Sequence, residues 1–120
     1  MSAFRPVILL VIILYVGFAN AEQTQQLRII PLSALDLEAV EKKTVHIVKG
    51  ENVKLIIEGK AGAVYHLHGY DLIAQLNADN HSVIILYAEF TGRYPLVQHL
   101  HDGLLGKHEF TVAYVEVKSP

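Results

Sequence analysis

Two pairs of histidines stand out in this sequence: His66 and His68 in "AVYHLHGYDL", and His99 and His101 in "QHLHDG". Side chains two residues apart in a β-strand point to the same face, so each pair would present two imidazoles together if its strand runs straight. Imidazole is the commonest protein ligand for metal ions. The spacing therefore predicts that the two pairs, on neighbouring strands, bring three or four ring nitrogens to one ion. The simpler interpretation is that each pair lies on a solvated strand face.

The composition restricts which metal such a site could hold. The chain has seven histidines, no cysteine and one methionine, which is Met1. A soft thiolate or thioether pocket for copper(I) cannot be built without these residues, whereas imidazole-rich sites suit copper(II), zinc or nickel. The expected cofactor is therefore copper, with zinc as the alternative. Because the imidazoles must be neutral to bind, affinity should fall as the pH drops through the imidazole pKa of about 6.5.

Carboxylates near the two pairs could support the ligands. Asp71 or Asp102 could accept the second ring proton of a ligating imidazole, an interaction that such ligands usually require. Asp71 is equally well explained as a turn residue, and Asp102 in "HDG" is more often a turn former than a carboxylate partner. Of the remaining histidines, His46 and His81 are expected at the surface, and His108 is expected to begin the last strand.

The elements that must position these residues are short apolar runs separated by turn signals. This pattern predicts an all-β sandwich, with strands over 27–30, 44–48, 53–58, up to 68, 81–90, 93–98 and 108–117. Pro31 should end the first strand. A tight hairpin or a corner should form at "KGEN", and a loop rich in histidine and glycine should follow Gln98. The segment 33–43 fits either a short helix or an irregular crossover.

The N-terminus has the pattern of a secretory signal peptide. Arg5 precedes the apolar run "VILLVIILYVGF", and "ANA" supplies small residues for cleavage after Ala21. The expected organisation is a signal peptide over 1–21 and one domain over 22–120, in the periplasm or secreted, without stable membrane insertion after cleavage. An uncleaved anchor is the alternative. The net charge of −2 gives no basic surface for nucleic acid.

With these features placed, the chain resembles a cupredoxin-like domain, a small periplasmic relative of the blue copper proteins. The resemblance is carried by "VHIVKGENVKLIIEG", "HLHGYDL" and "AEFTGRYPLVQHLHDGLLG", and the elements "HGYD" and "F-x-G-R-Y-P" are typical of a subset of that superfamily. It covers nearly all of 22–120. It implies a Greek-key β-sandwich of seven or eight strands.

The resemblance also implies positions for the ligands. Blue copper sites take one upstream histidine, then a cysteine, a second histidine and usually an axial methionine from a single loop. The corresponding positions in this chain are His66 or His68, Gln98, His99 or His101, and Leu104 or Leu105. The cysteine and the methionine are both missing. Electron transfer that depends on a copper–thiolate bond is therefore not expected.

The sequence thus predicts an exported protein that holds copper(II) through histidines and buffers the ion or transfers it to a periplasmic partner protein. No motif of a nucleophile or a phosphate-binding loop is present, and no enzymatic activity is expected. The alternative is a metal-free cupredoxin-like interaction module, with the loop "HDGLLGKH" as its contact surface. Fold alone does not decide between the two.

Overall fold

The computed structural model describes residues 26–36, 40–76, 80–102 and 106–120, together with the isolated positions 3, 13 and 17. The expected signal peptide therefore lies outside the described residues except at those three positions, and so does the middle of the segment 33–43. Within the described ranges, no helix has the length and apolar character needed to cross a bilayer.

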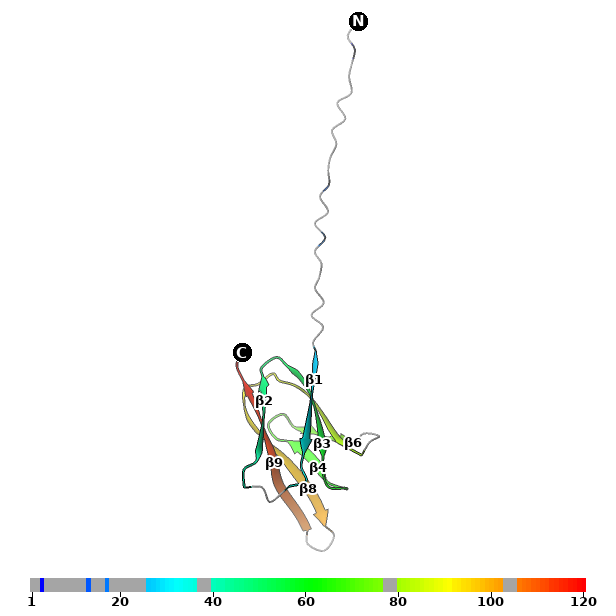
Figure 1. The fold of residues 1–120 in the computed structure, drawn as a ribbon, viewed down its shortest axis with the longest axis vertical. Coiled ribbons are helices and arrows are strands. Elements are labelled where there is room, and N and C mark those ends of the chain that lie inside the picture. Colours follow the sequence, from blue (N-terminus) through cyan, green and yellow to red (C-terminus); the bar gives the residue numbers. More distant parts are fainter. Residues whose placement is uncertain are drawn as a thin grey trace.

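Two β-sheets form the domain (Figure 1). The strands are β1 (Leu27–Ser33), β2 (Lys43–Val48), β3 (Asn52–Glu58), β4 (Val64–Leu67), β5 (Leu72–Ile73), β6 (Gln75–Leu76), β7 (Ser82–Tyr87), β8 (Gly92–Asp102) and β9 (Gly106–Lys118). One sheet has the order β1-β3-β7-β6 and the other the order β2-β9-β8-β4-β5. The prediction of an all-β sandwich is confirmed. Seven of these strands have four residues or more, while β5 and β6 have two each.

A single apolar core lies between the sheets, because alternate residues of each strand turn inward. In β3 the inward side chains are Val53, Leu55 and Ile57, all fully buried. The five-stranded sheet supplies the opposite layer, with Leu67 of β4 and Leu96 of β8 also fully buried. All of these residues belong to one continuous cluster. The register of β4 and β8 is thereby fixed, since a shift by one residue would turn these leucines to solvent.

One expectation about strand ends is corrected by the structure, and one of two alternatives at a second strand end is confirmed. Pro31 does not end the first strand, because β1 continues to Ser33 and Pro31 pairs with Ile56 of β3. Proline is tolerated here because β1 is an edge strand. The segment "KGEN" forms a corner and not a hairpin, since β2 and β3 belong to different sheets. Gly50 in this corner has a φ of 96°, a conformation that favours glycine.

The loop expected after Gln98 is also corrected. Strand β8 continues to Asp102 and pairs antiparallel with β9, which begins at Gly106. His99 and His101 therefore lie in a strand of a long hairpin. Each residue of β8 from His99 to Asp102 has a directly opposite partner in β9, so the pairing of the hairpin is unbroken there. The middle of the expected loop, residues 103–105, lies outside the described residues.

Candidate metal centre

The neighbouring strands β4 and β8 place the histidines on one face of the five-stranded sheet. Tyr65 is opposite Gln98 and both are buried, so these two residues point into the sandwich. The intervening residues must point outward. His66 is opposite Val97, and Val64 is opposite His99. The imidazoles of His66 and His99 therefore project from the same outer face of adjacent strands.

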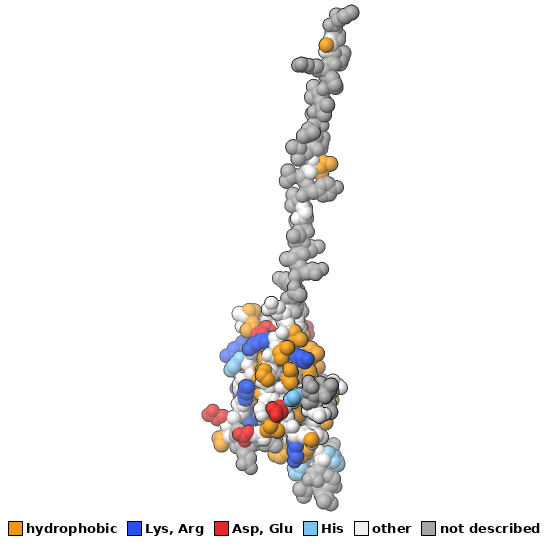
Figure 2. Space-filling view, turned by 45° about the vertical axis from the view of Figure 1, so that its right-hand side comes forward, with side chains coloured by type: hydrophobic (Ala, Val, Ile, Leu, Met, Phe, Trp, Pro, Cys, Tyr) orange, Lys and Arg blue, Asp and Glu red, His pale blue; other side chains and the backbone are white. Residues whose placement is uncertain are grey.

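Three imidazoles meet on this face. One ring nitrogen each from His66, His68 and His99 can be chosen so that all three lie within 4.8 Å of one another. The ring centroids of His66 and His68 are 4.3 Å apart. Those of His66 and His99 are 5.9 Å apart, and those of His68 and His99 6.2 Å. Figure 2 shows some of the chain's histidine side chains at the lower end of the view and others higher on the same face.

These distances can be compared with what a metal ion requires. With metal–nitrogen bonds of about 2.0–2.1 Å, tetrahedral geometry places ligating nitrogens about 3.3 Å apart. The three imidazoles must therefore close by about 1.5 Å or less, which side-chain rotation can provide. All three side chains are partly buried. Three nitrogens also leave a fourth position for water or another ligand.

His68 has the strongest structural indication of a missing partner. Its Nε2 atom is buried and has no hydrogen-bond partner within the part of the chain that the structure describes. A buried polar atom without a partner costs free energy, commonly about 1–3 kcal/mol. A metal ion bound by the lone pair of this nitrogen would remove that cost. The sequence spacing predicted the pair His66 and His68, but it gave no sign of this buried nitrogen.

The turn after β4 holds His68 in place through aromatic packing. The backbone N–H of His68 donates to the carbonyl oxygen of Pro95 at 3.0 Å. Gly69 follows with a φ of 89°, and a Cβ atom there would lie 2.4 Å from the ring of Tyr94. The rings of Tyr70 and Tyr94 meet edge to face at 4.7 Å. Both tyrosine hydroxyls donate to the carbonyl oxygen of Phe90, at 2.7 and 3.0 Å.

This packing explains what the elements "HGYD" and "F-x-G-R-Y-P" do in the fold. Glycine permits close contact with the ring of Tyr94, and the two tyrosines tie the turn to the segment before β8. Burial raises the pKa of Tyr70, against the hydrogen bond to the Phe90 backbone, which lowers it. The hydroxyl therefore stays protonated at neutral pH and remains a donor. These residues position the turn that carries His68.

Two carboxylates lie beside the cluster, at different distances. The Nδ1 atom of His99 lies 3.2 Å from Oε1 of Glu109, its cross-strand neighbour in β9. The Nε2 atom of His66 lies 3.9 Å from Oδ1 of Asp71, which is too long for a hydrogen bond. Asp71 was one of the two expected supports, and its side chain is 89% exposed. Glu109 was missed, because its contact depends on the β8–β9 register.

Two other expected positions are not in the cluster. His101 is exposed and is not part of the three-histidine group. Gln98, placed by the resemblance near the missing cysteine, points to the opposite side of the sheet. Its side chain is fully buried and its Oε1 accepts a hydrogen bond from the Tyr65 hydroxyl at 2.8 Å. The side chains of Asp102, Leu104 and Leu105 lie outside the described part of the structure.

A cavity of about 430 Å³ adjoins the cluster on one side. Its lining residues are Gly62, Val64, His99, Leu100, His101 and Glu109. His101 thus shares this opening with His99, although it is not close enough to the other imidazoles to bind the same ion. The opening gives solvent and small ligands a route to the His99 side of the cluster.

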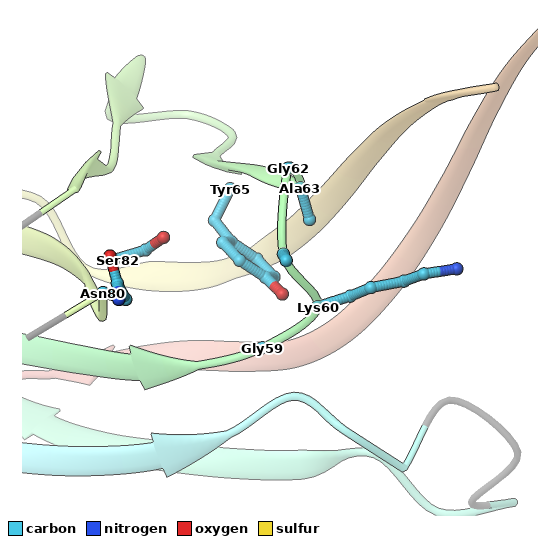
Figure 3. Close-up of a pocket in the computed structure, with 8 residues that line it drawn as sticks. Gly59, Lys60, Gly62, Ala63, Tyr65, Asn80 and Ser82 are labelled. Carbon is cyan, nitrogen blue, oxygen red and sulfur yellow. The ribbon is translucent and has the colours of Figure 1, made fainter. Parts of the chain in front are cut away.

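A second cavity, of about 390 Å³, lies near the inward-facing side of β4 (Figure 3). The Tyr65 side chain reaches across to Gly59 and Lys60, while Asn80 and Ser82 lie on the other side. A Cβ atom at Gly59 would lie 1.6 Å from the Tyr65 hydroxyl oxygen, so glycine is required for this approach. This cavity has no member of the histidine cluster in its lining.

Comparison with known proteins gives little further information. No protein-family model matches the chain, and no curated protein matches it. Among solved structures, the chain is similar to the solution structure of amebosin, with 19% sequence identity and a TM-score of 0.40. The match covers 76% of this chain and 98% of that chain. A likeness this weak supports no inference about fold family or function.

Proposed function

We propose that this chain is an exported metal-binding protein that holds copper(II), or alternatively zinc, through His66, His68 and His99. The observation that carries the proposal is the convergence of three ring nitrogens within 4.8 Å, from strands β4 and β8, whose register the core fixes, and from the turn that follows β4. The buried and unpartnered Nε2 atom of His68 supports it independently. His101, the fourth expected ligand, is not included.

The choice of metal follows from the available ligands. Imidazoles without thiolate or thioether favour copper(II) or zinc over copper(I), and copper(II) binds a given nitrogen site more tightly than zinc. In this proposal the domain is cupredoxin-like and buffers the ion or transfers it to a partner protein. The open fourth position and the cavity beside His99 support transfer, because an incoming ligand can reach the metal from that side.

The test is a metal titration of protein purified after expression of the full chain. Copper(II) or zinc at about 100 times the dissociation constant should raise the free energy of unfolding by about 2.7 kcal/mol. The copper(II) EPR spectrum should show coupling to three imidazole nitrogens. The mass of the purified protein shows whether residues 1–21 have been removed, which tests export separately.

Two variants make the titration specific. His68→Ala should lose most of the metal-dependent rise in melting temperature and one nitrogen from the EPR coupling. His46→Ala is the matched control, because His46 is an exposed histidine in β2, outside the cluster. Equal metal binding by the wild type and His68→Ala would contradict the proposal.

The second candidate function, a metal-free interaction module, has support on the other sheet. The outward residues Leu27, Ile29, Ile85 and Tyr87 of β1 and β7 are each about half exposed or more. Figure 2, which brings this side forward, shows hydrophobic side chains gathered on it. Exposed apolar patches of this kind mark protein contact surfaces. If neither metal changes the stability of the wild type, this candidate is favoured over the metal site.

A further inference from the structure

We infer that Glu109 is a positioning residue that holds His99 in the tautomer with the proton on Nδ1, so that Nε2 is the nitrogen free to bind the metal. The role toward a metal rests on the proposed function. The tautomer itself is a property of the metal-free protein. It can therefore be tested whether or not a metal binds.

The geometry of the hairpin brings the two side chains together. His99 of β8 and Glu109 of β9 are directly opposite in the antiparallel register, so their side chains leave the same face of the sheet. The Nδ1 atom of His99 lies 3.2 Å from Oε1 of Glu109, within hydrogen-bond distance. The β8–β9 register shift lies between Leu96 and Val97, so the pairing at His99 is regular.

The chemistry of the two groups decides where the proton sits. An ionised carboxylate can only accept hydrogen bonds, and a neutral imidazole has one nitrogen that donates and one that accepts. The nitrogen facing Glu109 must therefore carry the proton. The other nitrogen, Nε2, then has a free lone pair, as a metal ligand requires. A carboxylate bonded to a ligating imidazole in this way fixes the orientation of the ring as well as its tautomer.

No comparable support reaches the other two imidazoles within the described ranges. The Asp71 carboxylate is 3.9 Å from Nε2 of His66, and Nε2 of His68 has no hydrogen-bond partner. The cavity beside His99 is otherwise lined by Gly62, Val64, Leu100 and His101. Glu109 is therefore the carboxylate at hydrogen-bond distance from the cluster, and His99 is the ligand whose binding nitrogen is fixed in advance.

The first experiment measures the tautomer in the metal-free full chain at about pH 8, where an imidazole with a pKa of about 6.5 is neutral. Long-range ¹H–¹⁵N NMR distinguishes protonated from bare ring nitrogens, and His99→Ala assigns the signals. We expect a protonated Nδ1 and a bare Nε2 in the wild type. In Glu109→Ala the two ¹⁵N shifts should move toward each other, because both tautomers become populated.

The matched control is Glu116→Ala. Glu116 also lies in β9 and pairs across the hairpin, with Arg93 at 3.8 Å, but it is seven residues from Glu109. This variant removes one carboxylate from the same hairpin and should leave the His99 signals unchanged. A wild-type His99 protonated at Nε2 would overturn the inference, and so would a tautomer unchanged in Glu109→Ala.

The second experiment measures metal affinity in Glu109→Gln. The amide keeps the size of the side chain and removes the charge, and it should weaken copper(II) or zinc binding about 10- to 100-fold. Glu116→Gln should bind as the wild type does. If Glu109→Gln also binds as the wild type does, the positioning role is wrong. If the wild type binds neither metal, the proposed function fails, while the NMR result still decides the tautomer.

Discussion

On the inner face of β4 and β8, Tyr65 and Gln98 are buried and joined by a hydrogen bond of 2.8 Å. On the outer face of the same two strands, His66 and His99 are partly exposed, and their rings lie 5.9 Å apart without bonding to each other. The backbone pairing is shared, because alternate residues go to opposite sides. One register thus produces both a closed polar pair and an open group of ligands.

This difference indicates that the inner face of the two strands contributes mainly to stability, whereas the outer face carries the groups that could bind a ligand. Inner-face groups gain free energy by removal from water and by pairing with one another, so their replacement should mainly change folding. The outer-face imidazoles of His66 and His99 are only partly buried, and Nε2 of His68 has no partner within the described ranges. Both outer sheet faces expose apolar side chains, Ile29 and Ile85 on the four-stranded sheet and Val64 and Ile73 on the five-stranded sheet, but the three-histidine cluster lies on the five-stranded sheet.

Among the substitutions that test this separation, the largest effect on the free energy of unfolding is expected at Leu67. Leu67 lies between His66 and His68 in the sequence, and its side chain is fully buried. Leu67→Ala should lower the free energy of unfolding by about 2–5 kcal/mol, because it removes apolar contacts and leaves a cavity. Denaturant unfolding measures this loss. The molecules that remain folded should bind metal with the wild-type stoichiometry.

Ile85→Ala is the control for Leu67→Ala, because Ile85 is 65% exposed on the outer face of the other sheet. A change within about 0.5 kcal/mol is expected there. Should Leu67→Ala cost less than 1 kcal/mol, the inner face would not be the source of stability. Loss of metal stoichiometry in folded Leu67→Ala would show that the two faces are not separable.

A smaller effect is expected at Gly69, where β4 leaves the sheet. Gly69→Ala places a side chain at a φ of 89° and a Cβ atom 2.4 Å from the ring of Tyr94. The left-handed backbone alone costs about 1–3 kcal/mol, and displacement of the ring adds to it. Because the turn carries His68, metal affinity should fall together with stability. Thermal unfolding with and without metal measures both.

Gly50→Ala isolates the backbone contribution to the Gly69 result. Gly50 has a similar φ of 96°, but nothing lies within 4 Å of the Cβ position. Its variant should lose stability without losing metal affinity. If both variants lose the same stability and neither loses affinity, the contact between Gly69 and Tyr94 does not position His68.

Much of the fold could be predicted because alternation and turn residues act locally. The β-branched run in β7 and the alternation in β9 indicated strands, and Gly69 indicated the end of β4. The ends of β1 and β8 could not be predicted in this way. Whether Pro31 breaks a strand depends on whether that strand is at a sheet edge, and whether the chain pairs beyond Gln98 depends on its partner β9.

For the candidate site, local spacing predicted which residues share a face but not which faces meet. Alternation predicted the pair His66 and His68. His99 of β8 lies beside this pair because it is directly opposite Val64 of β4. His101 has the same spacing but lies farther along the hairpin and is exposed. Glu109 was missed because its position opposite His99 is set by the hairpin register. Gln98, which the resemblance placed near a ligand position, is buried on the face opposite the three histidines, because it alternates with His99 along β8.

The smallest effect is expected for the hydrogen bond between Tyr65 and Gln98. Tyr65→Phe leaves Oε1 of Gln98 without its donor, and Nε2 of Gln98 already has no partner among the described residues. The loss should be about 1–3 kcal/mol, and Gln98→Leu should lose a similar amount by leaving the hydroxyl proton of Tyr65 without its acceptor. The double variant should recover part of this loss, with a coupling of about 1 kcal/mol. Additive losses would contradict a paired inner face.

The same pair should respond to alkaline pH in a direction that its burial fixes. Burial raises the pKa of Tyr65 above 10.0 in the folded protein, against the Lys60 backbone hydrogen bond, which lowers it. The unfolded chain therefore loses this proton first, so the contribution of Tyr65 is full below about pH 10 and declines as the pH rises through its folded pKa. The stability difference between the wild type and Tyr65→Phe should accordingly shrink above pH 10. A difference that stays constant to pH 11 would mean that the hydroxyl is not held in a desolvated pair, and the contrast with the open imidazoles on the outer face would not hold.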